Sequence, residues 1–320
     1  MAAEIGSDVS HAAGILRAGG LVAIPTETVY GLAGNALNVE AVAKIFEAKQ
    51  RPEFDPLIVH VPSQEAVTRY VADFPPTARC LAEKFWPGPL TLVLPRRDVI
   101  PDLVTSGLPG VGIRIPQHPV TLELLRQIDF PLAAPSANLF GRLSPTTAQH
   151  VADQLAERVD YILDGGACRV GVESTVLELV AVPRLLRPGG VPLEEIQKLI
   201  GPVEIAASTD DPGNRAQVAP GMLPQHYAPR TPLRIVPHSA PPGRIGYLAF
   251  QKRPAGEFAS VEVLSPTGNL REAAANFFAA LRRLDEAKLD LILAEAFPEQ
   301  DLGRALNDRL RRGAVGTGHA

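Results

Sequence analysis

The chain is poor in cysteine and has no long hydrophobic run. Its 320 residues include two cysteines, Cys80 and Cys168, and neither a CxxC pair nor an HExxH motif occurs. A structural zinc site and a zincin are therefore excluded, and two thiols in a chain of this length are typical of a protein kept reduced. No stretch of about 18 apolar residues is present, and the first residues lack the basic and apolar parts of a signal peptide. We expect a soluble, cytoplasmic protein that makes no membrane contact.

Aromatic residues and positive charge are also scarce. Aromatics make up 5% of the sequence, and the formal net charge is −4. Residues 1–200 carry 17 basic and 22 acidic side chains. A protein that holds nucleic acid needs a surplus of cations for the phosphates and, for stacked bases, aromatic rings. The composition therefore argues against direct nucleic-acid binding. Hydrophobic residues at 46% and the length of the chain predict about two folded domains.

The common nucleotide and hydrolase motifs are missing as well. The chain contains no GxxxxGK[ST], and no GxGxxG follows a strand-like segment. A P-loop and the dinucleotide-binding fingerprint are thus excluded, and so is the GxSxG nucleophile elbow. If the protein handles a nucleotide, it uses another scheme.

Residues 1–200 contain both strand-like and helix-like segments. The strands are many and regular one-to-one crossovers are few, which favours an α+β or mixed α/β sheet over a doubly wound one. The expected strands are 21–24, 57–61, 90–94, 111–115, 131–134, 161–163 and 175–179. The expected helices are 7–18, 39–48, 78–85, 120–128 and 145–155. Ser7 and Ser144 are suitable N-caps for the first and last of these helices, and Pro145 suits a first helical position.

Residues 201–232 interrupt this pattern with proline, glycine and polar residues, which is typical of a linker. A smaller α/β domain is expected at 233–320. Its expected strands are 233–236, 245–250, 261–264 and 289–294, and its expected helices are 270–287 and 302–312.

Polar residues cluster where expected strands or helices end. Thr26 and Thr28 follow the strand at 21–24 and suit either a small polar ligand or a capped turn. Lys49 and Arg51 follow the helix at 39–48, where two cations could clamp phosphates or could complement the helix end. His60 lies inside a strand, and a lone histidine there is more often packed than functional.

A second group of polar residues is not explained by helix capping. Ser136 and Asn138 follow the strand at 131–134 and can donate hydrogen bonds to phosphate oxygens. Arg114 and Arg187 lie in apolar, strand-like runs. A buried arginine needs an anionic partner.

Taken together, these segments resemble the YrdC-like threonylcarbamoyl-AMP synthase family. The motifs that carry the resemblance are, in chain order, PTETVYGL, Lys49-Gln50-Arg51, RPEFDPLIVHV, WPGPLT, RIPQHP, PSAN, GVESTV, LRPG and PGM followed by HYAP. They cover essentially the whole chain and match the longer, two-domain form of the family.

The resemblance implies a fold and a reaction. The fold is a twisted, mixed but largely parallel sheet with helices around an open cationic cavity (residues 1–200), followed by a linker or lid (201–232) and a small Rossmann-like domain (233–320). The reaction converts ATP, L-threonine and bicarbonate into threonylcarbamoyl-AMP and pyrophosphate. A separate complex then transfers the threonylcarbamoyl group to an adenosine of tRNA. Mg²⁺ accompanies ATP and has no dedicated protein cage.

The resemblance also implies roles for individual residues. The catalytic, phosphate-binding tetrad is Lys49, Arg51, Ser136 and Asn138. Further ATP contacts are Asp55, Gly110, Ser144, Arg187, His226 and Tyr227. Threonine contacts are Thr28, His60, Arg114, Ala134 and Ser174, with Arg114 pairing with the threonine carboxylate. No residue is assigned to a metal.

Two positions depart from the family pattern. Asp55 stands where many relatives have asparagine beside the nucleotide, and a carboxylate there repels phosphates unless a metal or Arg51 intervenes. Leu223-Pro224-Gln225 replaces a more basic stretch before HYAP. We expect the segment 220–229 to pack over the cavity as a lid that excludes water, or else to dock the second domain.

Three other functions fit the sequence less well. Direct RNA binding is disfavoured by the acidic balance of residues 1–200. A carbamoyl-transfer enzyme of hydrogenase maturation would carry zinc-finger-like cysteines and an acylphosphatase-like segment, which this chain lacks. A regulatory protein with a decayed site would not be expected to retain the KxR and SxN pairs.

Overall fold

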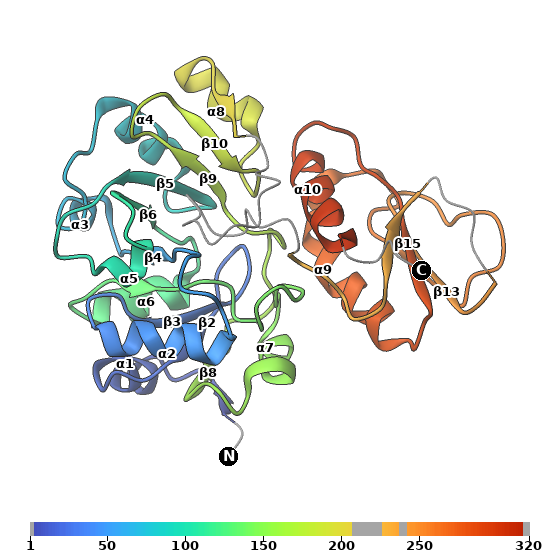
Figure 1. Ribbon diagram of the computed structural model, residues 1–320, viewed down its shortest axis with the longest axis horizontal. Coiled ribbons are helices and arrows are strands. Elements are labelled where there is room, and N and C mark those ends of the chain that lie inside the picture. The colour runs from blue at the N-terminus through green and yellow to red at the C-terminus, as the bar shows by residue number, and fades with distance from the viewer. Residues whose placement is uncertain (1–2, 207–225, 237–241, 316–320) are drawn as a thin grey trace.

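A single large mixed sheet forms the first part of the protein (Figure 1). The computed structural model describes residues 3–206, 226–236 and 242–315. Within these ranges, the strands of the large sheet follow the order β1-β8-β2-β3-β7-β4-β6-β5-β9-β10-β11. Their bounds are β1 Glu4–Gly6, β2 Val22–Ile24, β3 Gly31–Asn35, β4 Ile58–His60, β5 Leu90–Pro95, β6 Gly110–Arg114, β7 Leu132–Ala133, β8 Tyr161–Leu163, β9 Thr175–Glu178, β10 Arg184–Arg187 and β11 Glu204–Ile205.

The helices of this part are interspersed between the strands. They are α1 Val9–Arg17, α2 Val39–Lys49, α3 Gln64–Val67, α4 Pro76–Phe85, α5 Asp102–Thr105, α6 Pro119–Gln127, α7 Ala148–Leu155 and α8 Leu193–Ile200. The expected mixed α/β architecture is confirmed. None of the helices in the described part of the chain is long and apolar enough to cross a membrane.

The pairing within the large sheet is half parallel and half antiparallel. Among the described strands, five neighbouring pairs are parallel and five are antiparallel. The expected mixed sheet is confirmed, and its parallel pairs run from β1 to β2, between β4 and β6, between β5 and β9 and between β10 and β11. The connections from β2 to β3 and from β9 to β10 are too short to hold a crossover helix, so these strands pair antiparallel.

Both faces of the sheet are buried. Along β2, Val22 and Ile24 belong to the core beneath α1 and α6, whereas Ala23 belongs to the core on the opposite face. Successive side chains of a strand point to opposite faces, so a strand that is apolar throughout requires cover on both. The strand β11 pairs with β10 and extends this domain beyond the expected boundary at residue 200.

Helix α2 positions two candidate site residues. Val42, Ile45 and Phe46 bury one face of it, and the side chain of Asn38 caps its first turn by accepting hydrogen bonds from two backbone N–H groups. The helix ends at Lys49 because Gln50 takes a left-handed conformation with φ 53°. This turn directs the chain, and with it Arg51, away from the helix axis.

Two predicted helix caps are wrong. The helix α1 is capped by Asp8, whose Oδ1 accepts from the backbone N–H of His11, rather than by Ser7. The helix α7 starts later than expected, with Thr147 as its N-cap. Ser144 is therefore not a cap, and its hydroxyl is available for another partner.

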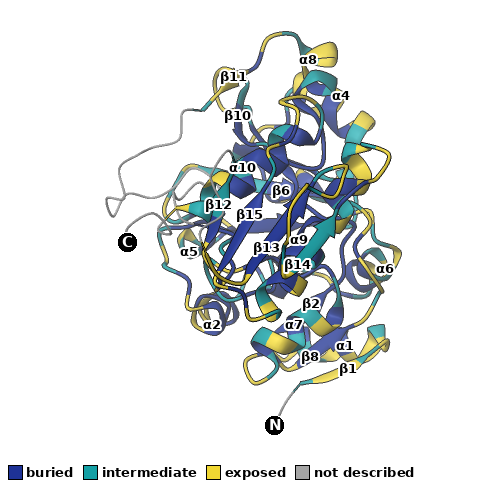
Figure 2. Ribbon diagram, turned by 90° about the vertical axis from the view of Figure 1, so that its right-hand side faces the viewer, coloured by how far each residue is buried: buried dark blue, intermediate teal, exposed yellow. Residues whose placement is uncertain are grey.

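The second domain contains a four-stranded sheet in the order β12-β15-β13-β14, and all of its neighbouring strands are parallel. Its elements are β12 Leu233–Ile235, β13 Ile245–Ala249, β14 Ser260–Val263, α9 Leu270–Glu286, β15 Leu291–Ala294 and α10 Gly303–Ala314. The strands β13 and β15 are buried almost throughout (Figure 2). The expected small α/β domain is confirmed.

The helices α9 and α10 lie between this small sheet and the first domain (Figure 1). Val29, Leu143 and Val172 of the first domain share an apolar cluster with residues of α9 and α10. Gly171, at φ 77°, sits so close to α9 that a Cβ would lie 2.2 Å from the carbonyl oxygen of Ala274. The two domains therefore share one packed interface.

Candidate active site

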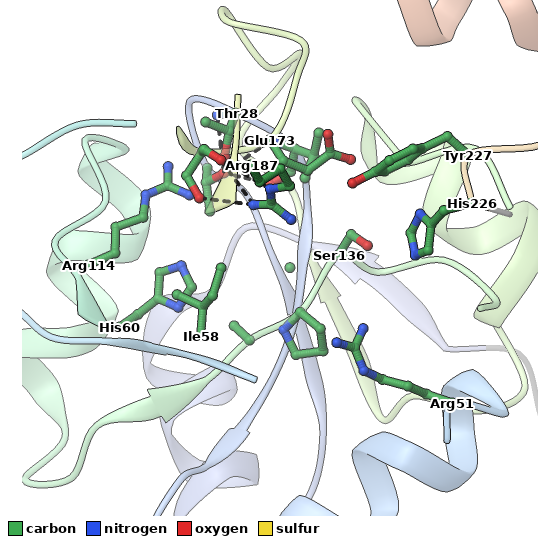
Figure 3. Close-up of a pocket in the computed structure, with 16 residues that line it drawn as sticks. Thr28, Arg51, Ile58, His60, Arg114, Ser136, Glu173, Arg187, His226 and Tyr227 are labelled. Atoms are coloured by element: carbon green, nitrogen blue, oxygen red, sulfur yellow. Dashed lines mark hydrogen bonds between the residues drawn. The ribbon is translucent and has the colours of Figure 1, made fainter. Parts of the chain in front are cut away.

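One pocket collects side chains from stretches that are far apart in the sequence (Figure 3). Ten of the predicted site residues line it: Thr28, Arg51, His60, Arg114, Ala134, Ser136, Ser174, Arg187, His226 and Tyr227. Figure 3 shows His60 and Arg114 on one side of the pocket and Arg51, His226 and Tyr227 on the other, with Ser136 and Arg187 between them. Five predicted residues do not line it, namely Lys49, Asp55, Gly110, Asn138 and Ser144.

Arg51 is held by its own loop. Its Nε donates to the carbonyl oxygen of Asp55 at 3.0 Å, and its Nη2 donates to that of Pro56 at 2.8 Å. Its Nη2 also lies 3.0 Å from Asp55 Oδ2, and both side chains are buried. Desolvation raises the pKa of Asp55 despite the opposing effect of Arg51. Asp55 is therefore the internal partner of Arg51 and does not line the pocket.

Lys49 lies beneath the loop that carries Ser136 and Asn138. Its Nζ donates to the carbonyl oxygens of both residues, at 2.6 Å in the case of Asn138. Burial, followed by the charge of Arg51, lowers the pKa of Lys49 well below its ordinary value. The structure thus gives Lys49 a role in holding this loop.

The loop itself follows β7. Ser136 pairs with Gly31 in an isolated antiparallel bridge, which fixes its backbone at the pocket wall. Asn138 is buried and donates through Nδ2 to the carbonyl oxygens of Leu139 and Arg142 at 2.8 and 2.9 Å. Its amide spans the turn from within, so Ser136 alone of this pair faces the pocket.

His226 and Tyr227 close one side of the pocket. Burial lowers the pKa of His226 far below its ordinary value, and the cations Arg51, Lys49, Arg187 and Arg312 lower it further. Four cations close enough to act on one imidazole make this side strongly electropositive, which suits a polyanion.

Tyr227 takes a left-handed backbone conformation with φ 62° and packs against the ring of His226 at 4.1 Å between centroids. Its hydroxyl is buried and has no hydrogen-bond partner within the described ranges. A buried polar group without a partner is uncommon and points to a contact that forms with a ligand.

Arg114 dominates the opposite side. Its Nη2 lies 2.5 Å from Glu27 Oε1, and its Nε donates to the carbonyl oxygen of Gly88 at 3.1 Å. Beside it, burial lowers the pKa of His60 to about 3, with Arg114 as the next cause, so His60 is neutral at physiological pH. His60 Nδ1 is buried without a partner in the described structure. This side offers an oriented cation and a neutral imidazole.

Hydroxyl groups line the floor between these two sides. Thr28 Oγ1 lies 2.8 Å from Thr26 Oγ1, and Ser174 Oγ lies 2.8 Å from Thr91 Oγ1. Arg187 donates from Nη2 to the carbonyl oxygen of Ser174 at 3.0 Å. The backbone N–H of Ala134 is bound to the carbonyl oxygen of Ile58 at 3.0 Å.

Glu173 also lines the pocket, although no role is predicted for it from the sequence. Ser144 donates its hydroxyl proton to Glu173 Oε1, which explains why Ser144 lies behind the pocket wall. The only available signal for Glu173 was its position in the GVESTV segment. Gly110 lies elsewhere, in a small separate cavity with Thr91, Thr105 and Gly112.

The arrangement favours the binding of two anionic groups side by side. Three arginines line a largely buried pocket, and hydroxyl donors lie between them. The described residues contain no group of three or more histidine, cysteine, aspartate or glutamate side chains placed to hold a metal. The cationic side chains that line the pocket are those of Arg51, Arg114 and Arg187.

The sequence matches two family models. Residues 14–189 match the Sua5/YciO/YrdC model, described as telomere recombination, and residues 191–315 match the model of the threonylcarbamoyl-AMP synthase C-terminal domain. The chain is a member of the Sua5 family. Its relatives include threonylcarbamoyl-AMP synthases of Pyrococcus abyssi, 44% identical over 94% of this chain and 92% of that one, and of Bacillus subtilis, 43% identical over 96% and 93%.

Solved Sua5 structures share the whole fold. The Pyrococcus abyssi Sua5 complexed with L-threonine is 42% identical, with a TM-score of 0.89 over 96% of this chain and 94% of that chain. A variant of the same Sua5 with a histidine and a tyrosine replaced by alanine has a TM-score of 0.88 at 40% identity, over 98% and 96%. A HypF structure at 23% identity and TM-score 0.52 covers 59% of this chain and 30% of that one, and shares the fold alone.

Proposed function

We propose that this Sua5 family member is a threonylcarbamoyl-AMP synthase that uses ATP, L-threonine and bicarbonate and releases pyrophosphate. The observation that supports this most directly is the convergence of residues from nearly every family motif on one pocket. Similarity to threonylcarbamoyl-AMP synthases over nearly the full length adds to it. So does the Sua5 relative that was solved with L-threonine.

We assign the side with Arg51, His226 and Tyr227 to the triphosphate. The cations around His226 make this side electropositive, and Ser136 supplies a hydroxyl donor at its edge. Lys49 supports the Ser136 loop from below, and Asn138 braces the same loop from within. In this proposal both residues keep the donors of the loop in place.

We assign the side with Arg114 and His60 to threonine. Arg114 Nη1, which has no partner among the described residues, would pair with the amino-acid carboxylate. The buried Nδ1 of His60 and the hydroxyl of Thr28 would bind the polar groups of the amino acid. The amine would then point to the centre of the pocket, toward the triphosphate.

The reaction follows from this placement. The amine nitrogen of threonine bonds to the carbon of bicarbonate, water leaves, and a carbamate forms. A carbamate oxygen then attacks the α-phosphorus of ATP while the bond to pyrophosphate breaks. Two anions must approach each other, so orientation and charge neutralisation by the arginines supply the rate enhancement, and no protein nucleophile is needed.

Mg²⁺ is proposed only as the companion of ATP. The carboxylates near the triphosphate side already have partners in the protein, since Asp55 lies against Arg51 and Glu173 accepts from Ser144. We therefore expect the metal to be held by the ATP phosphates and not by these carboxylates. Transfer of the product to tRNA is assigned to a separate complex, and we place the synthase with it in the cytoplasm.

The test is pyrophosphate release with each substrate omitted in turn. We expect release only when ATP, L-threonine and bicarbonate are all present, and we expect the nucleotide product to contain threonine carbon by mass spectrometry. Equal turnover with L-serine, or turnover without bicarbonate, would contradict the proposal.

A further inference from the structure

A buried arginine of the second domain contacts the pocket carboxylate of the first. Arg309, on α10, is 1% exposed, and its Nε donates to Glu173 Oε2 at 3.0 Å. Its Nη2 lies 3.0 Å from the same oxygen. Glu173 lines the pocket and accepts the hydroxyl proton of Ser144 on its other oxygen. Glu173 is thus held from both domains.

The rest of the Arg309 guanidinium is equally constrained. Its Nη1 donates to the carbonyl oxygen of Pro188 at 2.7 Å and to Asp308 Oδ2 at 2.8 Å. Its Cζ lies 4.9 Å from the ring centroid of Tyr227, which lines the pocket. Arg309 therefore contacts two pocket-lining residues without lining the pocket itself.

The ion pair with Arg309 changes the charge that Glu173 presents to the pocket. An unneutralised carboxylate at Glu173 would face the same pocket as the triphosphate, and in a dry site the repulsion would be large. We propose that Arg309 is a positioning residue through which the second domain neutralises Glu173 and so permits ATP to bind. This inference rests on the proposed function, because it takes ATP as the ligand of the pocket.

The chain offers a matched control on the same helix. Arg304 Nη2 lies 3.0 Å from Glu194 Oε1, which also joins α10 to the first domain. Both of these side chains are partly exposed, and neither residue lines the pocket. Loss of this pair removes an interdomain ion pair without changing the charge that faces ATP.

The experiment compares Arg309→Met, Arg309→Lys, Glu173→Gln, the double variant Arg309→Met/Glu173→Gln and the control Arg304→Met. For each full-length protein, calorimetry measures ATP and threonine affinity, and pyrophosphate release gives kcat and KM. We expect Arg309→Met to weaken ATP at least about tenfold, or 1.4 kcal/mol, with threonine affinity changed less than about threefold. Arg309→Lys should lie between this variant and the wild type, and Arg304→Met should match the wild type.

The double variant decides the mechanism. If Arg309 acts by neutralising Glu173, removing that charge restores ATP affinity to within about threefold of Glu173→Gln alone. Should Arg309→Met fail to fold, the double variant still tests the idea, since it contains no orphaned buried charge. A double variant as weak as Arg309→Met, a weak Arg304→Met, or wild-type ATP affinity in Arg309→Lys and Arg309→Met alike would overturn the inference. Failure of the wild type itself to release pyrophosphate would instead contradict the proposed function.

Discussion

Arg114 and Glu27 form a buried ion pair, with Arg114 Nη2 2.5 Å from Glu27 Oε1. Glu27 Oε2 accepts from the backbone N–H of Gln117 at 2.9 Å, so the carboxylate is fixed as well. The edge of the guanidinium formed by Nε and Nη2 is therefore held by the protein. A buried pair of this kind costs desolvation and is worth retaining where it orients a binding group.

The first prediction follows from that orientation. Arg114→Lys keeps a cation beside Glu27 but lacks the planar fork that can pair with Glu27 and with a second carboxylate at once. We expect threonine affinity to fall about tenfold, or 1.4 kcal/mol, and ATP affinity to stay within about twofold. Titration calorimetry with each ligand separately measures both, and an unchanged threonine affinity would remove Arg114 from the threonine site.

The second prediction concerns Arg51. Removing Arg51 alone would leave Asp55 buried without its ion-pair partner, which costs about 3–5 kcal/mol of stability. The double variant Arg51→Gln/Asp55→Asn removes both charges together. We expect it to fold and to lose about 10²–10³ in kcat, because a donor to the developing phosphate charge is gone.

The control for this variant is an ion pair between the strands β9 and β10. Arg184 Nη2 lies 2.7 Å from Glu178 Oε2, and neither residue lines the pocket. Arg184→Gln/Glu178→Gln should keep wild-type kcat in the pyrophosphate assay. If the Arg51 pair also keeps it, the charge of Arg51 does not act on the reaction.

The third prediction is a pH dependence of stability. The folded pKa of His60 is lowered to about 3 by burial, below the unfolded value near 6.5. The unfolded state therefore binds a proton first as the pH falls, and His60 makes the fold less stable between about pH 6.5 and pH 3. His60→Gln removes this loss. Relative to the wild type, we expect it to gain about 2 kcal/mol between pH 7.5 and pH 5, at 1.36 kcal/mol per unit.

Urea unfolding of both proteins at the two pH values measures this gain. At pH 7.5 both side chains are neutral, so that comparison isolates the packing cost of the substitution. If the difference in unfolding free energy between the two proteins is the same at both pH values, then His60 takes up a proton at pH 5 as readily in the folded state as in the unfolded state.

The local sequence was enough to predict the position of residues that lie in a turn directly after a strand or helix. Arg51 and Ser136 follow α2 and β7, and both were expected and found at the pocket wall. The strand β3 was missed because the segment GLAGN has few β-branched or aromatic residues, and pairing with β2 and β7 makes it a strand.

Contacts between distant segments could not be predicted from the sequence. Glu27 and Arg114 are brought together by β6 and the exit of β2, and Glu173 and Arg309 by the docking of α10. Ser144 was expected to cap a helix, and it donates to Glu173 instead because α7 begins at Ala148. Residues 220–225 of the expected lid segment 220–229 lie outside the described residues.

The fourth prediction uses the hydroxyl of Tyr227. Burial raises its pKa, so the phenol keeps its proton at neutral pH and can donate a hydrogen bond. It has no acceptor within the described ranges. Tyr227→Phe removes an unsatisfied buried group and should raise the unfolding free energy by about 1 kcal/mol. If ATP is the acceptor, the same change should weaken ATP about threefold to tenfold.

Tyr227→Phe is thus expected to raise the unfolding free energy and to weaken ATP binding. A hydroxyl that only packs in the fold would not give these two opposite effects. Tyr247 provides the matched control, because its hydroxyl donates to Glu295 Oε1 at 3.2 Å in the second domain, outside the pocket. Tyr247→Phe should lower stability slightly and leave ATP affinity at the wild-type value. Thermal unfolding and calorimetry of both variants give the four numbers needed. Tyr227→Phe that loses stability while keeping full ATP affinity would show that its hydroxyl serves the fold and not the nucleotide.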